Sequence, residues 1–233
     1  MIKFSNVSKK YKGGTLGLDG LDLEIQNSKV IGILGPNGSG KTTFLKLLNG
    51  YLKPTNGEIT IFNENIGPKT KSMVSYLPDM PFIPDDYTIL EAKSLWKNFF
   101  DDFNENKFDE LIEFMKLDQN ARISELSKGM NEKFHLTLIL SREAKIYVID
   151  EPISGVDLVS RDVILNAILK NVEKDRILVI TTHLVDEMES LFDDVVFLSK
   201  GKKILEGNAE QLREEKGKTI AEIFKDIYGV LVY

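Results

Sequence analysis

Cysteine is absent from the 233 residues, and no apolar run approaches the length of a membrane span. Without cysteine there is neither a disulfide framework nor thiolate chemistry, and a reducing cytoplasm is compatible with the chain. The first residues carry lysines with no apolar stretch after them, so we predict no signal peptide. If the protein works at a membrane, something other than a span of its own must hold it there.

A basic surplus is also missing. The chain has 30 Lys and Arg against 36 Asp and Glu, a formal net charge of −6, and the basic residues are spread along its length. Proteins that bind nucleic acid usually carry clustered positive charge. We therefore expect no nucleic-acid partner. Histidine is scarce as well, since only His135 and His183 are present.

What the chain does contain is the strand pattern of an α/β protein. Four short, continuous apolar runs lie at 30–34, 145–150, 176–181 and 194–199. Such runs suit strands of a parallel sheet that is covered on both faces. Alternating patterns at 21–26 and 58–63 indicate half-buried strands. We predict an α/β fold with a mostly parallel core sheet and an N-terminal antiparallel β part.

A largely helical segment interrupts this pattern. The stretches "TILEAKSLWKNFFDDF" and "KFDELIEFMKL" have the spacing of amphipathic helices. Phe134, Leu136, Leu138 and Leu140 alternate with period two, which favours a strand, but no turn signal separates them from the next strand, and we predict a helix. We expect one domain over 1–233. Its parts are an α/β core (1–87 and 145–207), an inserted helical subdomain (88–144) and a C-terminal helical tail (208–233).

A phosphate-binding loop follows the first buried run. "GPNGSGKT" at 35–42 matches G-x-x-x-x-G-K-[ST] and precedes a helix-compatible segment, as this motif requires. Its glycines let backbone N–H groups turn toward phosphates, and the helix start adds partial positive charge. Lys41 places a cation near the β and γ phosphates, and the Thr42 hydroxyl can ligate Mg²⁺. The candidate nucleotide-binding residues are Gly35, Pro36, Asn37, Gly38, Ser39, Gly40, Lys41, Thr42 and Thr43.

Two adjacent carboxylates end the run at 145–150. Unpaired carboxylates at the end of a sheet are costly to desolvate, so a cation is their natural partner. We expect Asp150 to hold Mg²⁺ through water and Glu151 to polarise the attacking water. His183 lies just past another buried run, where it can contact the γ phosphate. His135 is expected to be a packing or surface residue.

One motif points to a different class of nucleotide-binding protein. "NKFD" at 106–109 matches the N-K-x-D guanine-reading motif of GTPases. That motif should end a buried strand, whereas charged, helix-like sequence surrounds it here. The interval from Gly35 to Asp150 is also long for a compact nucleotide switch. We interpret the match as chance and expect ATP as the nucleotide.

Six motifs, in this order, resemble the ATP-binding cassette (ABC) family over essentially the whole chain. They are "GPNGSGKT", "YLPD", "LSKGM", "IYVIDEP", "SGVD" and "TTH". Tyr11 falls where the family carries an aromatic residue that stacks on adenine. The combination of "LSKGM" with "YLPD" looks like cassettes of antibiotic, lantibiotic or lipid exporters, whose permease is a separate polypeptide.

The resemblance implies that two cassettes, expected to be identical, hold ATP between them in a head-to-tail dimer. Each site joins the P-loop of one protomer to the signature of the other, and Asp157 communicates across the dimer. The signature residues are Ser127, Lys128, Gly129 and Met130. Ser127 and Gly129 also suit a helix N-terminus, which by itself is an anion site.

The implied catalytic residues are Glu151, His183 and Lys41. ATP binding closes the dimer, hydrolysis opens it, and a separately encoded membrane permease changes state in response. This arrangement places the protein in the cytoplasm, peripheral at the inner face of the cell membrane.

The chain departs from the family pattern at three motif positions. Lys128 and Met130 replace glycine and glutamine in the signature, and Lys128 costs about 1 kcal/mol if its position needs a positive φ. Asp79 replaces glutamine in the loop after "SMVSYL". Our hypothesis is that Asp79 lies at the Mg²⁺ site and increases dependence on Mg²⁺, because an unscreened carboxylate and γ phosphate repel each other. A solvent-facing Asp79 with no metal role is the alternative.

Phe82 and Ile83 are apolar residues in a proline-interrupted turn. They either tuck into the protein's own core or line a groove for a cytoplasmic helix of the permease. Two other functions compete with transport. A soluble ABC-type ATPase acting on nucleic acid or ribosomes resembles tandem cassettes or carries long coiled coils, and neither occurs here. Intact Lys41, Asp150 and Glu151 argue against a switch without turnover.

Overall fold

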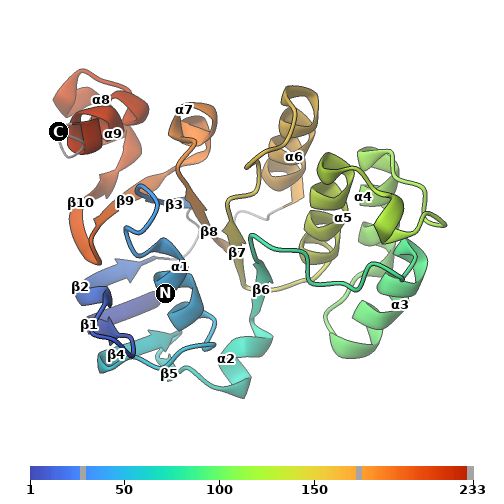
Figure 1. Cartoon of the computed structure of the whole chain (residues 1–233), viewed down its shortest axis with the longest axis horizontal. Helices are drawn as coiled ribbons and strands as arrows, with labels where there is room; N and C mark the ends of the chain where they lie inside the picture. Colours follow the sequence, from blue (N-terminus) through green and yellow to red (C-terminus); the bar gives the residue numbers. More distant parts are fainter. Residues whose placement is uncertain (27–29, 172–174, 230–233) are drawn as a thin grey trace.

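Two β-sheets and the helices around them make up the part of the chain that the computed structural model describes, residues 1–26, 30–171 and 175–229 (Figure 1). The larger sheet has six strands in the order β10-β9-β3-β8-β7-β6. Its strands are β3 (Val30–Leu34), β6 (Val74–Leu77), β7 (Ile146–Asp150), β8 (Ile177–Thr182), β9 (Asp194–Ser199) and β10 (Lys202–Asn208).

The six-stranded sheet is parallel except at its β10 edge, which pairs antiparallel with β9. The four strands predicted from continuous apolar runs are confirmed as β3, β7, β8 and β9. Every residue of β7 and β8 is buried, as expected for strands that are covered on both faces. Strand β10 is not predicted from the sequence, because its residues are exposed or half-buried and include charged side chains. The predicted fold class is confirmed.

The smaller sheet is antiparallel and has the order β2-β1-β4-β5. Its strands are β1 (Ile2–Lys10), β2 (Leu16–Ile25), β4 (Asn56–Ile61) and β5 (Glu64–Asn65). The strand predicted over 58–63 ends at Ile61. Phe62 and Asn63 have φ angles of 49° and 64°, a conformation that forms the turn into β5 and cannot continue a strand.

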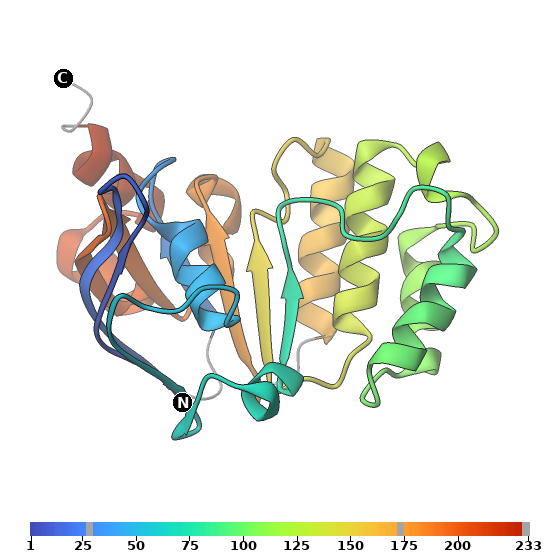
Figure 2. The ribbon, with the colours of Figure 1, turned by 60° about the horizontal axis from the view of Figure 1, so that its bottom comes forward.

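The six-stranded sheet separates two groups of helices. α1 (Lys41–Leu48) lies on the side of the small sheet, whereas α5 (Lys128–Leu140) and α6 (Leu158–Asn171) lie on the other side (Figures 1 and 2). The buried side chains form two clusters accordingly, one of which surrounds Phe44 of α1 and the other Phe134 of α5. The start of α1 and the start of α5 are thus kept apart within one chain.

The segment 88–144 is helical, as predicted, with α3 (Ile89–Phe99), α4 (Glu105–Met115), the short 3₁₀ turn η1 (Ile123–Glu125) and α5. The period-two pattern in α5 does not mark a strand, because every residue of 134–140 is buried between neighbouring elements. His135 is a packing residue: its ring contacts Phe82 and Phe134.

The "NKFD" segment lies inside α4 and does not form a guanine site. Lys107 Nζ donates to the carbonyl of Asn171 at 2.9 Å. Both oxygens of Asp109 accept hydrogen bonds from Lys93 Nζ at 2.8 Å. These side chains tie helices together, which supports the interpretation of the motif as chance.

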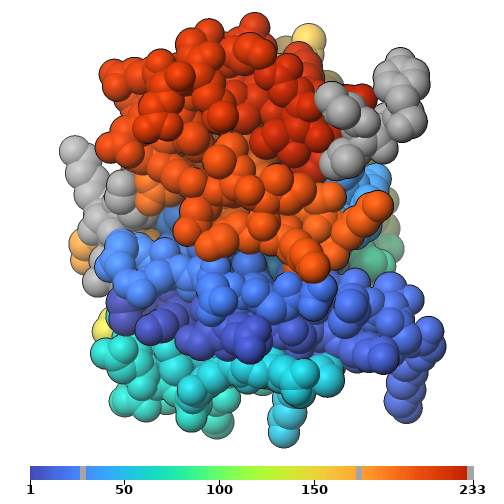
Figure 3. Space-filling view, turned by 90° about the vertical axis from the view of Figure 1, so that its left-hand side faces the viewer, coloured from blue at the N-terminus to red at the C-terminus, as the bar shows by residue number. Residues whose placement is uncertain are grey.

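The helices that follow β8 pack beside β9 and the edge strand β10. They are α7 (Val185–Met188), the 3₁₀ turn η2 (Glu189–Leu191), α8 (Ala209–Lys216) and α9 (Ile220–Gly229), while α2 (Pro68–Ser72) lies near the small sheet. In Figure 3 these C-terminal segments (orange and red) lie directly above the N-terminal sheet (blue). Residues 230–233 of the predicted tail lie outside the described residues. Within the described ranges, no helix has the length and apolar character that crossing a membrane requires.

Candidate nucleotide site

The P-loop joins β3 to α1 and leaves the start of α1 open to an anion. Gly40 occupies the N-cap position with a φ of 115° and has no side chain that could cap the helix. The first turn contains no acidic residue either. The first N–H groups of a helix then seek an external acceptor, and the helix dipole favours negative charge. Thr42 is exposed at this helix start. The geometry suits a phosphate.

Ser39 adds a buried polar atom to the loop. It is only 3% exposed, and its Oγ has no hydrogen-bond partner among the described residues. A buried hydroxyl without a partner is costly. A bound phosphate oxygen would satisfy it.

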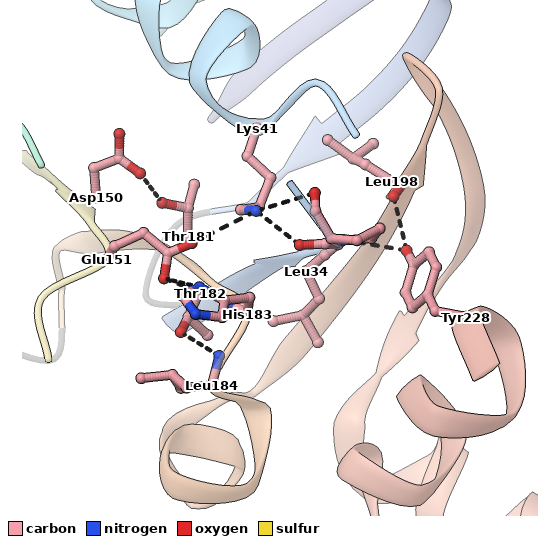
Figure 4. Close-up of polar contacts among 12 residues, drawn as sticks. Leu34, Lys41, Asp150, Glu151, Thr181, Thr182, His183, Leu184, Leu198 and Tyr228 are labelled. Carbon is pink, nitrogen blue, oxygen red and sulfur yellow. Dashed lines mark hydrogen bonds and ion pairs between the residues drawn. The ribbon is translucent and has the colours of Figure 1, made fainter. Parts of the chain in front are cut away.

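The Lys41 ammonium is held back against the loop and faces Glu151 (Figure 4). Nζ donates to the carbonyls of Gly35 at 2.7 Å and Pro36 at 3.4 Å, and lies 3.5 Å from Glu151 Oε1. The Lys41 side chain is 6% exposed. A buried ammonium must be paired, and a nucleotide phosphate could take the place of these carbonyls.

Asp150 is a buried carboxylate with one unpaired oxygen. Thr181 donates a hydrogen bond to Oδ1, whereas Oδ2 has no partner in the described chain. Burial raises the pKa of Asp150 to about 6, and the charges of Asp79 and Glu151 act in the same direction. Each of these effects disfavours the ionised form, and a cation would reverse them. The donor set is therefore compatible with Mg²⁺.

Glu151 and His183 meet across the ends of β7 and β8. Glu151 Oε2 accepts hydrogen bonds from His183 Nδ1 at 2.9 Å and from the His183 backbone N–H at 3.2 Å. Because a carboxylate only accepts, Nδ1 carries the proton in this contact. Glu151 has a φ of 49°, a conformation that is strained for a non-glycine residue and often marks functional sites. The structure thus brings Lys41, Glu151 and His183 together.

Tyr11 and Asp79 flank this cluster. Tyr11 is 37% exposed, and its hydroxyl lies 3.0 Å from Thr43 Oγ1, so its ring stands beside the P-loop helix. Asp79 is exposed in the loop after β6, and its charge contributes to the raised pKa of Asp150.

The signature residues lie at the start of α5, away from the P-loop of the same chain. Ser127 is the N-cap, and its hydroxyl accepts from the Met130 N–H at 3.3 Å. Gly129 is buried against the segment after β7, since an added Cβ would lie 3.1 Å from Ser160 Oγ and 3.2 Å from Asp157 Oδ2. Lys128 is an ordinary helical residue with no positive φ, so the cost foreseen for it does not arise.

Two residues that the structure places at these sites are not among the predicted site residues. Thr181 is the hydrogen-bond donor to Asp150, and its place in "TTH" would have been a usable signal. Gly155 lies beneath the Lys128 side chain, and no local pattern pairs these positions.

Comparison with known proteins agrees with this geometry. Residues 18–154 match the ABC transporter family. The Nod factor export ATP-binding protein I of Burkholderia orbicola is 32% identical over 96% of this chain and 76% of its own length. That of Cupriavidus pinatubonensis is 28% identical, with 97% and 72% covered.

Solved structures share the fold. An ATP-binding subunit of an ABC transporter superposes with a TM-score of 0.86 at 22% identity, covering 97% of this chain and 98% of that one. A dimeric, post-hydrolysis ATP-binding cassette with ADP and Pi gives a TM-score of 0.79 at 22% identity, with 89% and 98% covered. The family match and the relatives together lead to one conclusion. The chain belongs to the ABC transporter family, as an ATP-binding subunit with ATPase activity.

Proposed function

We propose that this cassette binds ATP with Mg²⁺ at the P-loop and uses its hydrolysis to drive a separately encoded membrane permease, as an exporter subunit. The observation that carries the proposal is the cluster in which Glu151 contacts both Lys41 and His183. It places a cation, a carboxylate and an imidazole at the start of α1, where the phosphates would bind.

Thr42 and Asp150 would hold Mg²⁺, with Asp79 as a further candidate. The unpaired Asp150 Oδ2 supports this assignment. When bound, Mg²⁺ supplies positive charge that neutralises the β and γ phosphates.

The chain's own residues then have distinct roles. Lys41 and the N–H groups of 35–43 bind the phosphates, and Tyr11 stacks on the adenine. Glu151 orients and polarises the attacking water, while His183 holds the γ phosphate and is itself oriented by Glu151.

We further propose that the site is completed by a second copy of the chain. Helix α5, whose start holds the signature residues 127–130, lies beyond the six-stranded sheet from α1 (Figure 2). These residues are therefore poorly placed to serve their own P-loop. A head-to-tail dimer would bring them to the partner's γ phosphate. Asp157, which lies beside Gly129, would link the two sites.

The permease would dock beside the α3 segment. Ile83 is buried in the core, whereas Phe82 is half-buried. Phe82 lines a groove together with Tyr76, Trp96, Phe100 and Arg142. Ile83 thus follows the first alternative for this turn. The second alternative, a groove that receives a permease helix, is our proposal for Phe82. The exporter assignment is supported by the names of the relatives.

The proposed organisation is an α/β core (1–87 and 145–207), a signature subdomain (88–144) and a C-terminal tail (208–233), held at the cytoplasmic face of the membrane by the permease. The net charge of −6 supports a function without nucleic acid.

The test is Glu151→Gln, which removes the carboxylate but keeps its shape. With ATP and Mg²⁺ we expect ATPase activity to be lost and a stable dimer to appear in size-exclusion chromatography with light scattering. Glu151→Gln combined with Lys41→Ala should stay monomeric. A Glu151→Gln protein that remains monomeric at saturating ATP would contradict the proposed dimer.

A further inference from the structure

The C-terminal helix α9 reaches the base of the P-loop through one side chain. Tyr228 is 5% exposed, and its hydroxyl donates to the carbonyl of Leu198 at 2.8 Å, with the carbonyl of Leu34 at 3.4 Å (Figure 4). Leu34 ends β3 and immediately precedes Gly35. The tyrosine therefore holds the ends of the two strands that flank the start of the P-loop.

The Leu198 carbonyl also contacts Gly35, the first residue of the P-loop. A Cβ added at Gly35 would lie 2.6 Å from Leu198 O and 2.5 Å from Ser39 Oγ. Such distances are too short for any side chain, so Gly35 packs directly on that carbonyl. A displacement of Leu198 O would be transmitted to Gly35, whose own carbonyl accepts from Lys41 Nζ.

The turn after β9 also binds the P-loop through a backbone hydrogen bond. Gly201 N–H donates to the carbonyl of Ser39 at 2.9 Å. Leu198 and Gly201 therefore contact the first and the fifth residue of the P-loop from one short segment, and Tyr228 is the side chain that anchors this segment to α9.

α9 is fixed to the segment that follows His183 as well. Lys225 Nζ lies 3.1 Å from Asp186 Oδ2, and Ala221 N–H donates to Glu189 Oε2 at 2.9 Å. The Tyr228 ring packs against Phe224, with ring centroids 4.6 Å apart. α9 thus bridges two elements of the candidate γ-phosphate site.

We propose that Tyr228 is a positioning residue for nucleotide binding. Its hydroxyl fixes the position of the Leu198 carbonyl, against which Gly35 of the P-loop packs. The inference rests on the assignment of ATP to the P-loop. Tyr228 does not contact the nucleotide. Without its hydroxyl, the Leu198 carbonyl loses this donor and the strand ends are free to shift.

The experiment compares two buried hydroxyls. Tyr228→Phe is matched by Tyr147→Phe, since Tyr147 is 2% exposed and donates to the carbonyl of Arg142, away from the P-loop. We expect both variants to lower Tm by a few degrees. Only Tyr228→Phe should weaken ATP binding in calorimetry, by a factor of about 3 to 10. Its KM for ATP should rise in parallel, with kcat within about two-fold of the parent.

Equal ATP affinity of Tyr228→Phe, Tyr147→Phe and the parent would overturn the inference while leaving the proposed function intact. Failure of the parent to bind ATP would instead contradict the proposed function. If Tyr228→Phe does not fold, the unaltered chain provides the test through hydrogen exchange. ATP should slow amide exchange in 220–229 as well as in 35–43, and protection confined to 35–43 would overturn the inference.

Discussion

The Lys128 side chain lies across Gly155, in the space that a Cβ at position 155 would fill. Gly155 has a φ of 69°, a conformation in which glycine carries little penalty. Lys128 of the signature and Gly155, two residues before Asp157, are therefore neighbours in space, although neither position predicts the other in the sequence.

Gly155→Ala should lower the free energy of unfolding by about 1 kcal/mol, because the added Cβ disfavours the left-handed conformation. The end of a lysine side chain is flexible and can move aside. Lys128→Ala should therefore recover less than about 0.5 kcal/mol of the loss. Urea denaturation of both single variants and the double variant measures this coupling. Full recovery in the double variant would show that Lys128 is held rigidly over Gly155.

Thr181→Val should destabilise the nucleotide-free protein by about 1–3 kcal/mol. The substitution removes the buried hydrogen bond that the Thr181 hydroxyl donates to Asp150. Thr60→Val, at a half-buried position of β4, is the matched control and should have little effect. Chemical denaturation with and without ATP and Mg²⁺ gives the comparison. We expect the loss to be smaller with both ligands, and equal stability of Thr181→Val and the parent would contradict the role of the hydroxyl.

Asp79→Gln should reach half-maximal ATPase activity at a lower Mg²⁺ concentration than the parent. The charge of Asp79 acts on Asp150, and removing it reduces repulsion toward the phosphates when Mg²⁺ is scarce. Asp86→Asn removes an exposed charge from the same connecting segment and should leave the Mg²⁺ titration unchanged. An identical titration for Asp79→Gln and the parent would favour a solvent-facing aspartate.

Arg142→Met should lower the free energy of unfolding by about 3 kcal/mol. Arg142 is 3% exposed, pairs with Asp102 through Nε and Nη2 at 2.9 and 3.0 Å, and donates to the carbonyl of Val74 at 2.8 Å. The substitution leaves the Asp102 carboxylate and the carbonyl without their donor. Lys69→Met, which breaks the exposed pair with Glu64, should change stability by less than about 0.5 kcal/mol. Similar losses from both substitutions, measured by urea denaturation, would refute this ranking.

The local sequence pattern predicts an element correctly where properties of its own residues decide its structure. The apolar run at 30–34 became β3, and the glycine-rich stretch after it became a strand-to-helix loop, because burial on both faces and freedom of φ are properties of the residues themselves. The period-two alternation in 134–140 is weaker evidence than the missing turn signal. α5 is buried on all sides over 134–140, and complete burial removes the difference between a helical and a strand pattern.

The sequence by itself determined the family, the fold class and the position of the P-loop motif, since these depend on residue types at short spacing. Tertiary structure alone decided which distant groups meet. Tyr228 is 194 positions from Leu34, and the approach of Glu151 to Lys41 depends on how β7 and β3 are placed in one sheet. Strand order and the packing of α9 bring these groups together, and no local periodicity encodes contacts of that separation.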